Sequence, residues 1–178
     1  MYKIPYLNHR ISKEESILLA QAFLDSQLVA KIIINKLLKG SEIERYSILW
    51  SLRNLPLNDQ NTISNFPTLI LETIRCYPEN NSIKRCGLAI LQDINIPHEI
   101  MGELYTTCFN FLNNSAEAIV TKVFSMSICF RIAKINPELI EELRLIIEEN
   151  LVLFGRNSPG IYSRGNKILG QISNILGK

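Results

Sequence analysis

The sequence of 178 residues contains few of the residues that build catalytic, metal or disulfide sites. It has two histidines, His9 and His98, and four cysteines without a Cys-x-x-Cys spacing. It lacks a glycine-rich phosphate loop, a nucleophile elbow and a His-Glu-x-x-His sequence. We therefore expect no cofactor, no metal site and no enzymatic activity, with the cysteines present as reduced, mostly buried thiols.

Strong net charge and long apolar runs are also missing. The chain carries 19 basic and 17 acidic side chains, a net charge of +2, so no strong field steers it toward nucleic acid or membrane. Residues 1–10 lack the apolar core of a secretory signal. The most apolar stretch, residues 17–38, is interrupted by Asp25, Lys31 and Lys36. These features predict a cytoplasmic protein that does not enter a membrane.

Signals for β-strands are nearly absent, whereas signals for helix starts and ends recur along the chain. Two capping boxes, one asparagine before a proline and one terminal glycine mark such ends: Ser12 with Glu15, Ser41 with Glu44, Asn136 with Pro137, and Gly40. The sequence predicts helices over residues 12–39, 42–55, about 60–76, 82–95, 97–113, 115–135, 137–154 and 162–176. Whether the first helix is continuous or broken near Asp25-Ser26 stays open.

One apolar pattern returns at a regular interval in every second predicted helix. Each of these helices carries apolar residues at i, i+3 and i+6: Leu49, Leu52 and Leu55; Leu88, Leu91 and Ile94; Met126, Cys129 and Ile132; Leu169, Ile172 and Ile175. Successive triplets begin 39, 38 and 43 residues apart. A period near 40 residues is typical of helix-pair repeats, which bury their apolar faces by stacking.

Residues 121–133 and 83–94 resemble the second helix of a HEAT repeat, and residues 136–139 resemble the opening of a first helix. The resemblance to HEAT repeats, in the armadillo-like class, covers about residues 41–176. It implies an all-α, right-handed superhelix (an α-solenoid) of about four HEAT-like helix pairs. We expect a single domain over residues 1–178, with repeats at about 12–56, 57–96, 97–135 and 136–176.

Basic residues stand at or near the start of each second helix: Arg45, Lys84, Lys122 and Arg164. The resemblance implies that second helices line the concave side of the superhelix. Four cations along that side would form a stripe suited to an acidic peptide or a phosphate backbone. In the alternative interpretation each cation pairs with a neighbouring turn or helix C-terminus and holds the stack together. The five glutamates of helix 137–154 are interpreted as a solvated or a functional acidic face.

Three functions fit these observations. The first is a non-catalytic scaffold that binds an unidentified protein or peptide on its concave face. The second is a nucleic-acid-binding module using the same face, as in the alkylpurine DNA glycosylases, which resemble this fold and carry groove tryptophans with an aspartate. Here Trp50 is the single tryptophan, and Asp93 is the only aspartate after Asp59. The third is a part of a larger assembly that docks by its apolar end near Ile175 and Leu176; the oligomeric state stays open.

Overall fold

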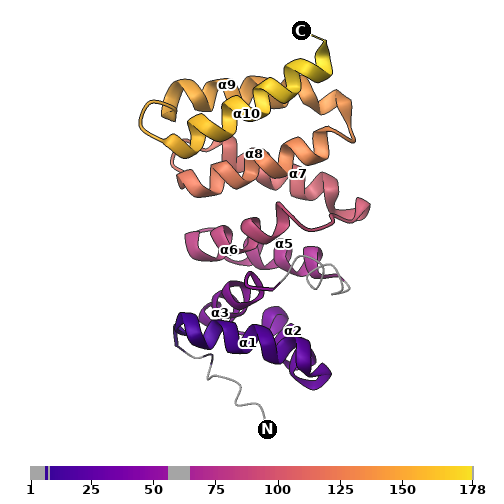
Figure 1. Cartoon of the computed structure of the whole chain (residues 1–178), viewed down its shortest axis with the longest axis vertical. Coiled ribbons are helices and arrows are strands. Elements are labelled where there is room, and N and C mark those ends of the chain that lie inside the picture. Colours follow the sequence, from indigo (N-terminus) through magenta and orange to yellow (C-terminus); the bar gives the residue numbers. More distant parts are fainter. Residues whose placement is uncertain (1–6, 8, 56–64, 178) are drawn as a thin grey trace. The chain divides into compact units, whose positions relative to one another are not determined.

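The structure is a computed structural model that describes residue 7 and residues 9–55 and 65–177. These residues form helices joined by turns and irregular segments, with no strand among them. The chain divides into two compact units, unit 1 over residues 1–95 and unit 2 over residues 96–178 (Figure 1). The all-helical class is therefore confirmed, whereas the superhelix of about four helix pairs and the single domain with its repeat bounds stay predictions.

Unit 1 contains five described helices: α1 (Lys13–Asp25), α2 (Gln27–Lys39), α3 (Glu42–Leu52), α5 (Phe66–Cys76) and α6 (Asn81–Leu91). Helix α3 packs on α1 and on α6, while α2 packs on α1, α3 and α5. Helix α5 also packs on α6. We call α1, α3 and α6 the second layer of this unit, and α2 and α5 its first layer. The predicted start of the helix at about residue 60 lies outside the described residues.

The predicted helix over residues 12–39 is two helices, which settles the question that the sequence left open. Ser26 adopts an extended conformation (φ −141°, ψ 113°), and its hydroxyl accepts a hydrogen bond from the Val29 backbone N–H at 3.4 Å. The axes of α1 and α2 differ by 120° at this break. None of the described helices is by itself long and apolar enough to cross a bilayer; α1 and α2 meet those criteria only as this bent pair.

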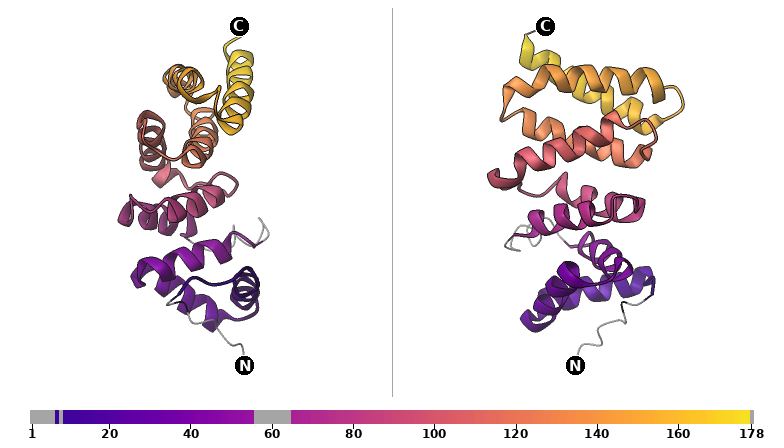
Figure 2. Two further views of the ribbon diagram at one scale, coloured as in Figure 1. Left: turned by 90° about the vertical axis from the view of Figure 1, so that its left-hand side faces the viewer. Right: turned by 180° about the vertical axis from the view of Figure 1, so that it is seen from behind.

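Unit 2 contains α7 (His98–Asn113), α8 (Ile119–Ala133), a 3-10 turn (Pro137–Leu139), α9 (Ile140–Phe154) and α10 (Pro159–Leu176). Helices α7 and α8 pack on each other, and α9 and α10 do the same. Packing of α7 on α9 and of α8 on α10 then sets α7 and α9 in a first layer and α8 and α10 in a second (Figure 2). Helix α10 begins earlier than predicted because Pro159 is favourable at the first helical position.

The predicted helix-end signals at Ser12, Ser41 and Gly40 are confirmed, whereas the one at Asn136 is confirmed in position only. Both capping boxes form, with Ser12 and Ser41 as the N-caps of α1 and α3. Asn136 stands at the predicted N-cap position with Pro137 after it, but its side chain makes no capping hydrogen bond there. Its Nδ2 instead donates to the Ile132 carbonyl at 3.0 Å, one turn back in α8, and Pro137 begins the 3-10 turn. The asparagine therefore closes the preceding helix.

Within each unit, several hydrogen bonds join two residues that are about one repeat length apart in the sequence. In four pairs the partners are 38 residues apart: His9 with Ser47, Ser16 with Asn54, Glu42 with Asn80, and Leu112 with Asn150. Arg164 and Ser127 form a fifth pair at a separation of 37 residues. Neighbouring repeats are thus joined at equivalent positions by polar contacts, in addition to the apolar packing.

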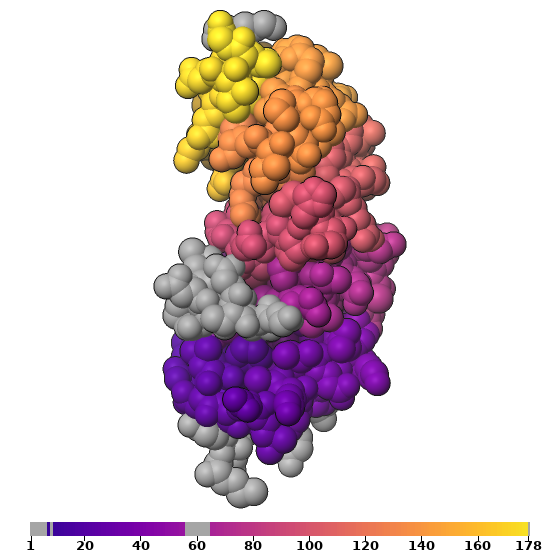
Figure 3. All heavy atoms as spheres, turned by 90° about the vertical axis from the view of Figure 1, so that its right-hand side faces the viewer, coloured from indigo at the N-terminus to yellow at the C-terminus, as the bar shows by residue number. Residues whose placement is uncertain are grey.

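The apolar triplets lie where the period places them. All members of the first three triplets are at most 5% exposed, and burial of each such side chain contributes about 1.5–3 kcal/mol. In the last triplet Ile172 is buried, whereas Ile175 is 50% exposed. Helix α10 packs on α8 and α9. Its last turn, in yellow, lies at the surface of unit 2 (Figure 3).

Candidate interaction surface

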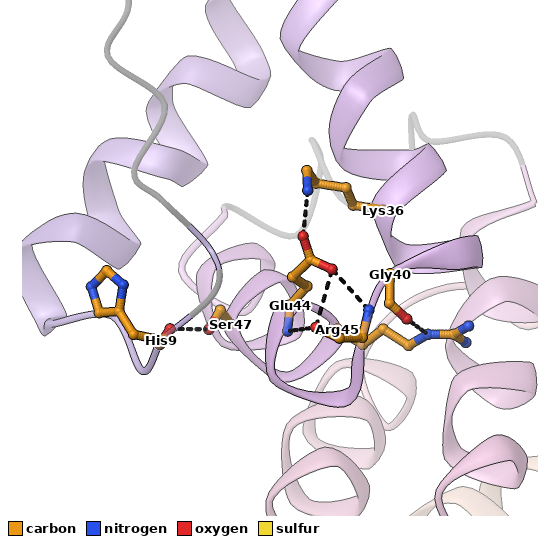
Figure 4. A network of polar contacts seen from close by, with 7 residues as sticks. His9, Lys36, Gly40, Glu44, Arg45 and Ser47 are labelled. Atoms are coloured by element: carbon orange, nitrogen blue, oxygen red, sulfur yellow. Dashed lines mark hydrogen bonds and ion pairs between the residues drawn. The ribbon is translucent and has the colours of Figure 1, made fainter.

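Arg45, the first cation of the predicted stripe, closes the end of a first-layer helix. Its Nε donates to the Gly40 carbonyl at 2.9 Å (Figure 4). Its Nη2 donates to the Leu38 carbonyl at 2.6 Å. Its guanidinium carbon also lies 5.3 Å from the centre of the Tyr77 ring. Carbonyls at a helix C-terminus lack partners within the helix and carry partial negative charge, so a cation there stabilises α2.

A second polar contact holds the same turn. The Glu44 carboxylate accepts from the Ser41 backbone N–H at 2.8 Å and pairs with the Lys36 ammonium (Figure 4). The Lys36 contact, followed by the Ser41 N–H, lowers the pKa of Glu44 below its ordinary value. The connection between α2 and α3 is therefore fixed from both sides, by Arg45 on the carbonyls of α2 and by Glu44 on the start of α3.

Lys122, on α8, repeats the contact of Arg45 in unit 2. Its side chain is fully buried, and its Nζ donates to the carbonyls of Leu112 at 2.7 Å and Phe111 at 3.2 Å, in the last turn of α7. The Nζ also lies 5.0 Å from the centre of the Phe154 ring. Burial lowers the pKa of the Lys122 ammonium, and the charges of Glu117 and Glu149 oppose that shift.

The other two members of the predicted stripe differ from each other. Lys84, on α6, is only 4% exposed. Arg164, on α10, is partly exposed, and its Nη1 donates to the Ser127 hydroxyl of α8. Arg45 and Lys84 belong to unit 1, and Lys122 and Arg164 to unit 2. Within each unit the contacts fit the stack-holding interpretation, and a binding stripe along all four residues stays a prediction.

Unit 1 carries a surface that sequence reasoning missed. Tyr46 and Trp50 lie one turn apart on α3, with ring centres 6.1 Å apart and planes inclined by only 11°. The Arg10 guanidinium carbon lies 5.9 Å from the centre of the Tyr46 ring. The spacing of Tyr46 and Trp50 was the available signal, because residues at i and i+4 share a helix face. No pattern in the sequence predicts that Arg10, in the segment before α1, lies over the Tyr46 ring.

A hollow of about 390 Å³ lies beside this aromatic pair, between the starts of α3 and α6. It is lined by residues of both helix starts and of the preceding segment: Arg10, Ser41, Glu42, Ile43, Tyr46, Asn80 and Ser82. Asn80 caps α6 by accepting hydrogen bonds from the backbone N–H groups of Ser82 and Ile83, both at 2.9 Å, and donates to the Glu42 carboxylate. This volume suits one side chain or small group.

The carboxylates of α9 form a largely solvated ion-pair network. Arg144 donates to Glu141 at 2.7 Å and to Glu148 at 2.6 Å, and these contacts raise the pKa of the arginine. Apolar side chains are exposed on the same helix, with Val152 at 81% and Leu145 at 54%. Among the described residues, no group of three or more histidine, cysteine or carboxylate side chains is placed to hold a metal ion.

Comparison with known proteins identifies one family. The family model described as a HEAT repeat domain matches residues 6–172. No curated protein matches the chain, and no solved structure does. The match covers more than nine-tenths of the chain, including every described helix before α10 and most of α10.

Proposed function

The chain belongs to the HEAT repeat domain family, and on that premise we propose that it is a non-catalytic module that binds a partner protein or peptide. HEAT repeat domains are commonly protein-interaction scaffolds and are generally non-catalytic. We further propose that the partner lies on the outward face of the second-layer helices, which is the concave side in a superhelix of such repeats. Nucleic acid on the same face is the alternative.

The observation that carries this proposal is the way the second-layer helices are joined. In unit 1 Asn80 at the start of α6 bonds to Glu42 of α3, and in unit 2 Arg164 of α10 bonds to Ser127 of α8. Each contact joins two second-layer helices that are one repeat apart in the sequence. The outward side chains of these helices therefore follow one another in a fixed order. A regular array of this kind is suited to an extended partner.

The predicted basic residues take two roles in this proposal. Arg45, Lys84 and Lys122 act within the fold, because two of them close helix ends and Lys84 is buried. Arg164 holds α10 to α8 through Ser127 and also reaches the surface, where it contacts the partner. Reversing the charge of Lys84 or Lys122 would bury a carboxylate and unfold the unit, so binding is tested at exposed positions.

The test is recovery of partners from native lysate on the immobilised full chain, with and without nuclease. We expect a defined, nuclease-resistant protein that is lost with Arg164→Glu and retained with the control Arg156→Glu, which reverses an exposed arginine in the turn before α10. Nuclease-sensitive recovery would replace this proposal with the nucleic-acid alternative. Recovery unchanged by Arg164→Glu would place the contact elsewhere, at acidic α9 or near Ile175 and Leu176.

A further inference from the structure

Five residues of unit 1 form what we call the arginine–aromatic patch: Arg10, Tyr46, Trp50, Arg53 and Arg85. Tyr46, Trp50 and Arg53 follow one another on α3 at i, i+4 and i+7 and therefore share one helix face. Arg85 stands 39 residues after Tyr46, at the equivalent position of α6. Because α3 packs on α6, the patch extends across two neighbouring second-layer helices.

The aromatic part of the patch is preorganised. Tyr46 stacks on Trp50, and the Arg10 guanidinium lies over the Tyr46 ring. Both rings are partly exposed, so their faces and edges are accessible from solvent. A rigid pair of aromatic rings offers a large contact area and loses little conformational entropy on binding, which is why tyrosine and tryptophan are enriched at binding hot spots.

Within the part of the chain that the structure describes, the arginines of the patch are not held in ion pairs. Among the described residues, no carboxylate lies within ion-pair distance of Arg10, Arg53 or Arg85. This distinguishes them from Arg144, which holds two glutamates. Arg53 and Arg85 also lie near the same buried thiol, since the charges of both lower the pKa of Cys86 against the larger effect of burial. The patch thus combines one aromatic pair with three guanidinium groups that have no carboxylate partner among the described residues.

The hollow between the starts of α3 and α6 adds a recess to this surface. Arg10 and Tyr46 belong both to the patch and to the wall of the hollow, so the two are continuous. Helix N-termini carry partial positive charge, which favours an anionic group near the starts of α3 and α6. Glu42 occupies part of the same wall. A single carboxylate fits beside Arg10, and the charge of Glu42 opposes a second anionic group in the same hollow.

We propose that the arginine–aromatic patch binds an acidic peptide segment, with an acidic side chain in the hollow against Arg10 and further carboxylates on Arg53 and Arg85. Guanidinium groups match carboxylates with two parallel hydrogen bonds, and the aromatic pair supports the apolar parts of the segment. Nucleic acid is disfavoured because the net charge is only +2 and phosphate recognition needs a longer basic track. This inference rests on the proposed function and specifies its partner.

The single tryptophan provides the readout, because Trp50 lies within the patch. The full chain is titrated with a random copolymer of glutamate and tyrosine while tryptophan is excited selectively. A copolymer of lysine and tyrosine and a single-stranded oligothymidine serve as the opposite-charge and phosphate probes. We expect a saturable change of Trp50 emission with the acidic copolymer and none with the basic one.

Variants locate the site. Arg53→Gln and Arg85→Gln are each expected to weaken binding roughly tenfold, the loss of one charge-assisted contact. The matched control Arg156→Gln, an exposed arginine of unit 2, is expected to leave binding unchanged. If all three variants weaken binding equally, or if no variant weakens it, the proposed site is wrong. If oligothymidine binds more tightly than the acidic copolymer, with an affinity that falls steeply between about 50 and 200 mM salt, the proposed ligand class is wrong.

Failure of this inference is distinguishable from failure of the proposed function. If the acidic copolymer does not bind, but native lysate still yields a nuclease-resistant protein that depends on Arg164, the patch is wrong and the interaction module stands. If neither the copolymer nor a lysate protein is bound, both proposals fail.

Discussion

Replacing Lys122 with methionine tests whether this member of the predicted basic stripe stabilises the fold by closing α7. Methionine keeps most of the length and volume of the lysine side chain but removes the ammonium group. The carbonyl of Phe111 then loses the Lys122 donor, whereas the carbonyl of Leu112 keeps the Asn150 Nδ2 donor at 3.1 Å. The change therefore isolates the closure of α7 by Lys122.

The expected magnitude follows from two opposing effects. Hydrogen bonds from a charged donor contribute about 1.5–3 kcal/mol each, so removal of both costs the fold several kcal/mol in the first instance. The ammonium is buried, however, and methionine avoids the cost of desolvating a charge while filling the same space. We expect the Lys122→Met variant to be less stable than wild type by about 1–2 kcal/mol.

The difference in stability between wild type and the Lys122→Met variant depends on pH. Because burial lowers the pKa of Lys122 below 10.5, the unfolded chain binds this proton more tightly than the folded chain. The wild type therefore gains stability as the pH rises from the lowered pKa to 10.5, and the methionine variant does not share that gain. The difference in stability between the two proteins should widen over this range.

Urea unfolding followed by far-ultraviolet circular dichroism measures these differences. The control is Lys167→Met, which removes an exposed lysine of α10 in the same unit and should change stability by less than about 0.5 kcal/mol. If Lys122→Met is as stable as this control, or if its difference from wild type narrows with rising pH, Lys122 does not close α7 as described.

Three further predictions concern other parts of the fold. Cys76 is exposed and should be alkylated rapidly in the native protein, while the three buried thiols react only after unfolding, as mass spectrometry would show. Gly40→Ala should destabilise the protein by about 1–3 kcal/mol in urea unfolding, because a Cβ there would lie 2.3 Å from the Lys36 carbonyl oxygen. Gly102→Ala should instead stabilise α7 by about 0.5–1 kcal/mol, because a Cβ there would have no atom within 4 Å. Glu44→Gln should reduce stability near neutral pH, and its difference from wild type should shrink as the pH falls below 4.5 through the lowered pKa of Glu44.

Those elements that depend on short-range patterns were predictable from the sequence. The capping boxes at Ser12 and Ser41 form because donor and acceptor lie three residues apart, whatever the rest of the fold does. The first three apolar triplets are buried because their spacing follows the helical period. Asn136 failed as a cap because the same amide can serve the helix that ends before it, and the residue type alone does not choose between the two.

The candidate surface was less predictable because it depends on what lies opposite each side chain. The sequence places Lys122 near the start of a second helix, but its partners are backbone carbonyls of α7, which no residue type identifies. The arginine–aromatic patch combines Arg10, residues of α3 and Arg85 of α6. The packing of α3 on α6 and the approach of Arg10 to Tyr46 bring them together, and no motif or charge count predicts either contact.

Photo-crosslinking in native cells tests the central claim most directly. Benzoylphenylalanine at position 50 replaces one aromatic ring of the patch with a reactive one, and the same residue at position 31, an exposed site on first-layer helix α2, is the control. The account predicts a defined protein adduct from position 50 and none from position 31. Adducts from position 31 alone, or none from either position, would contradict binding through the second-layer face.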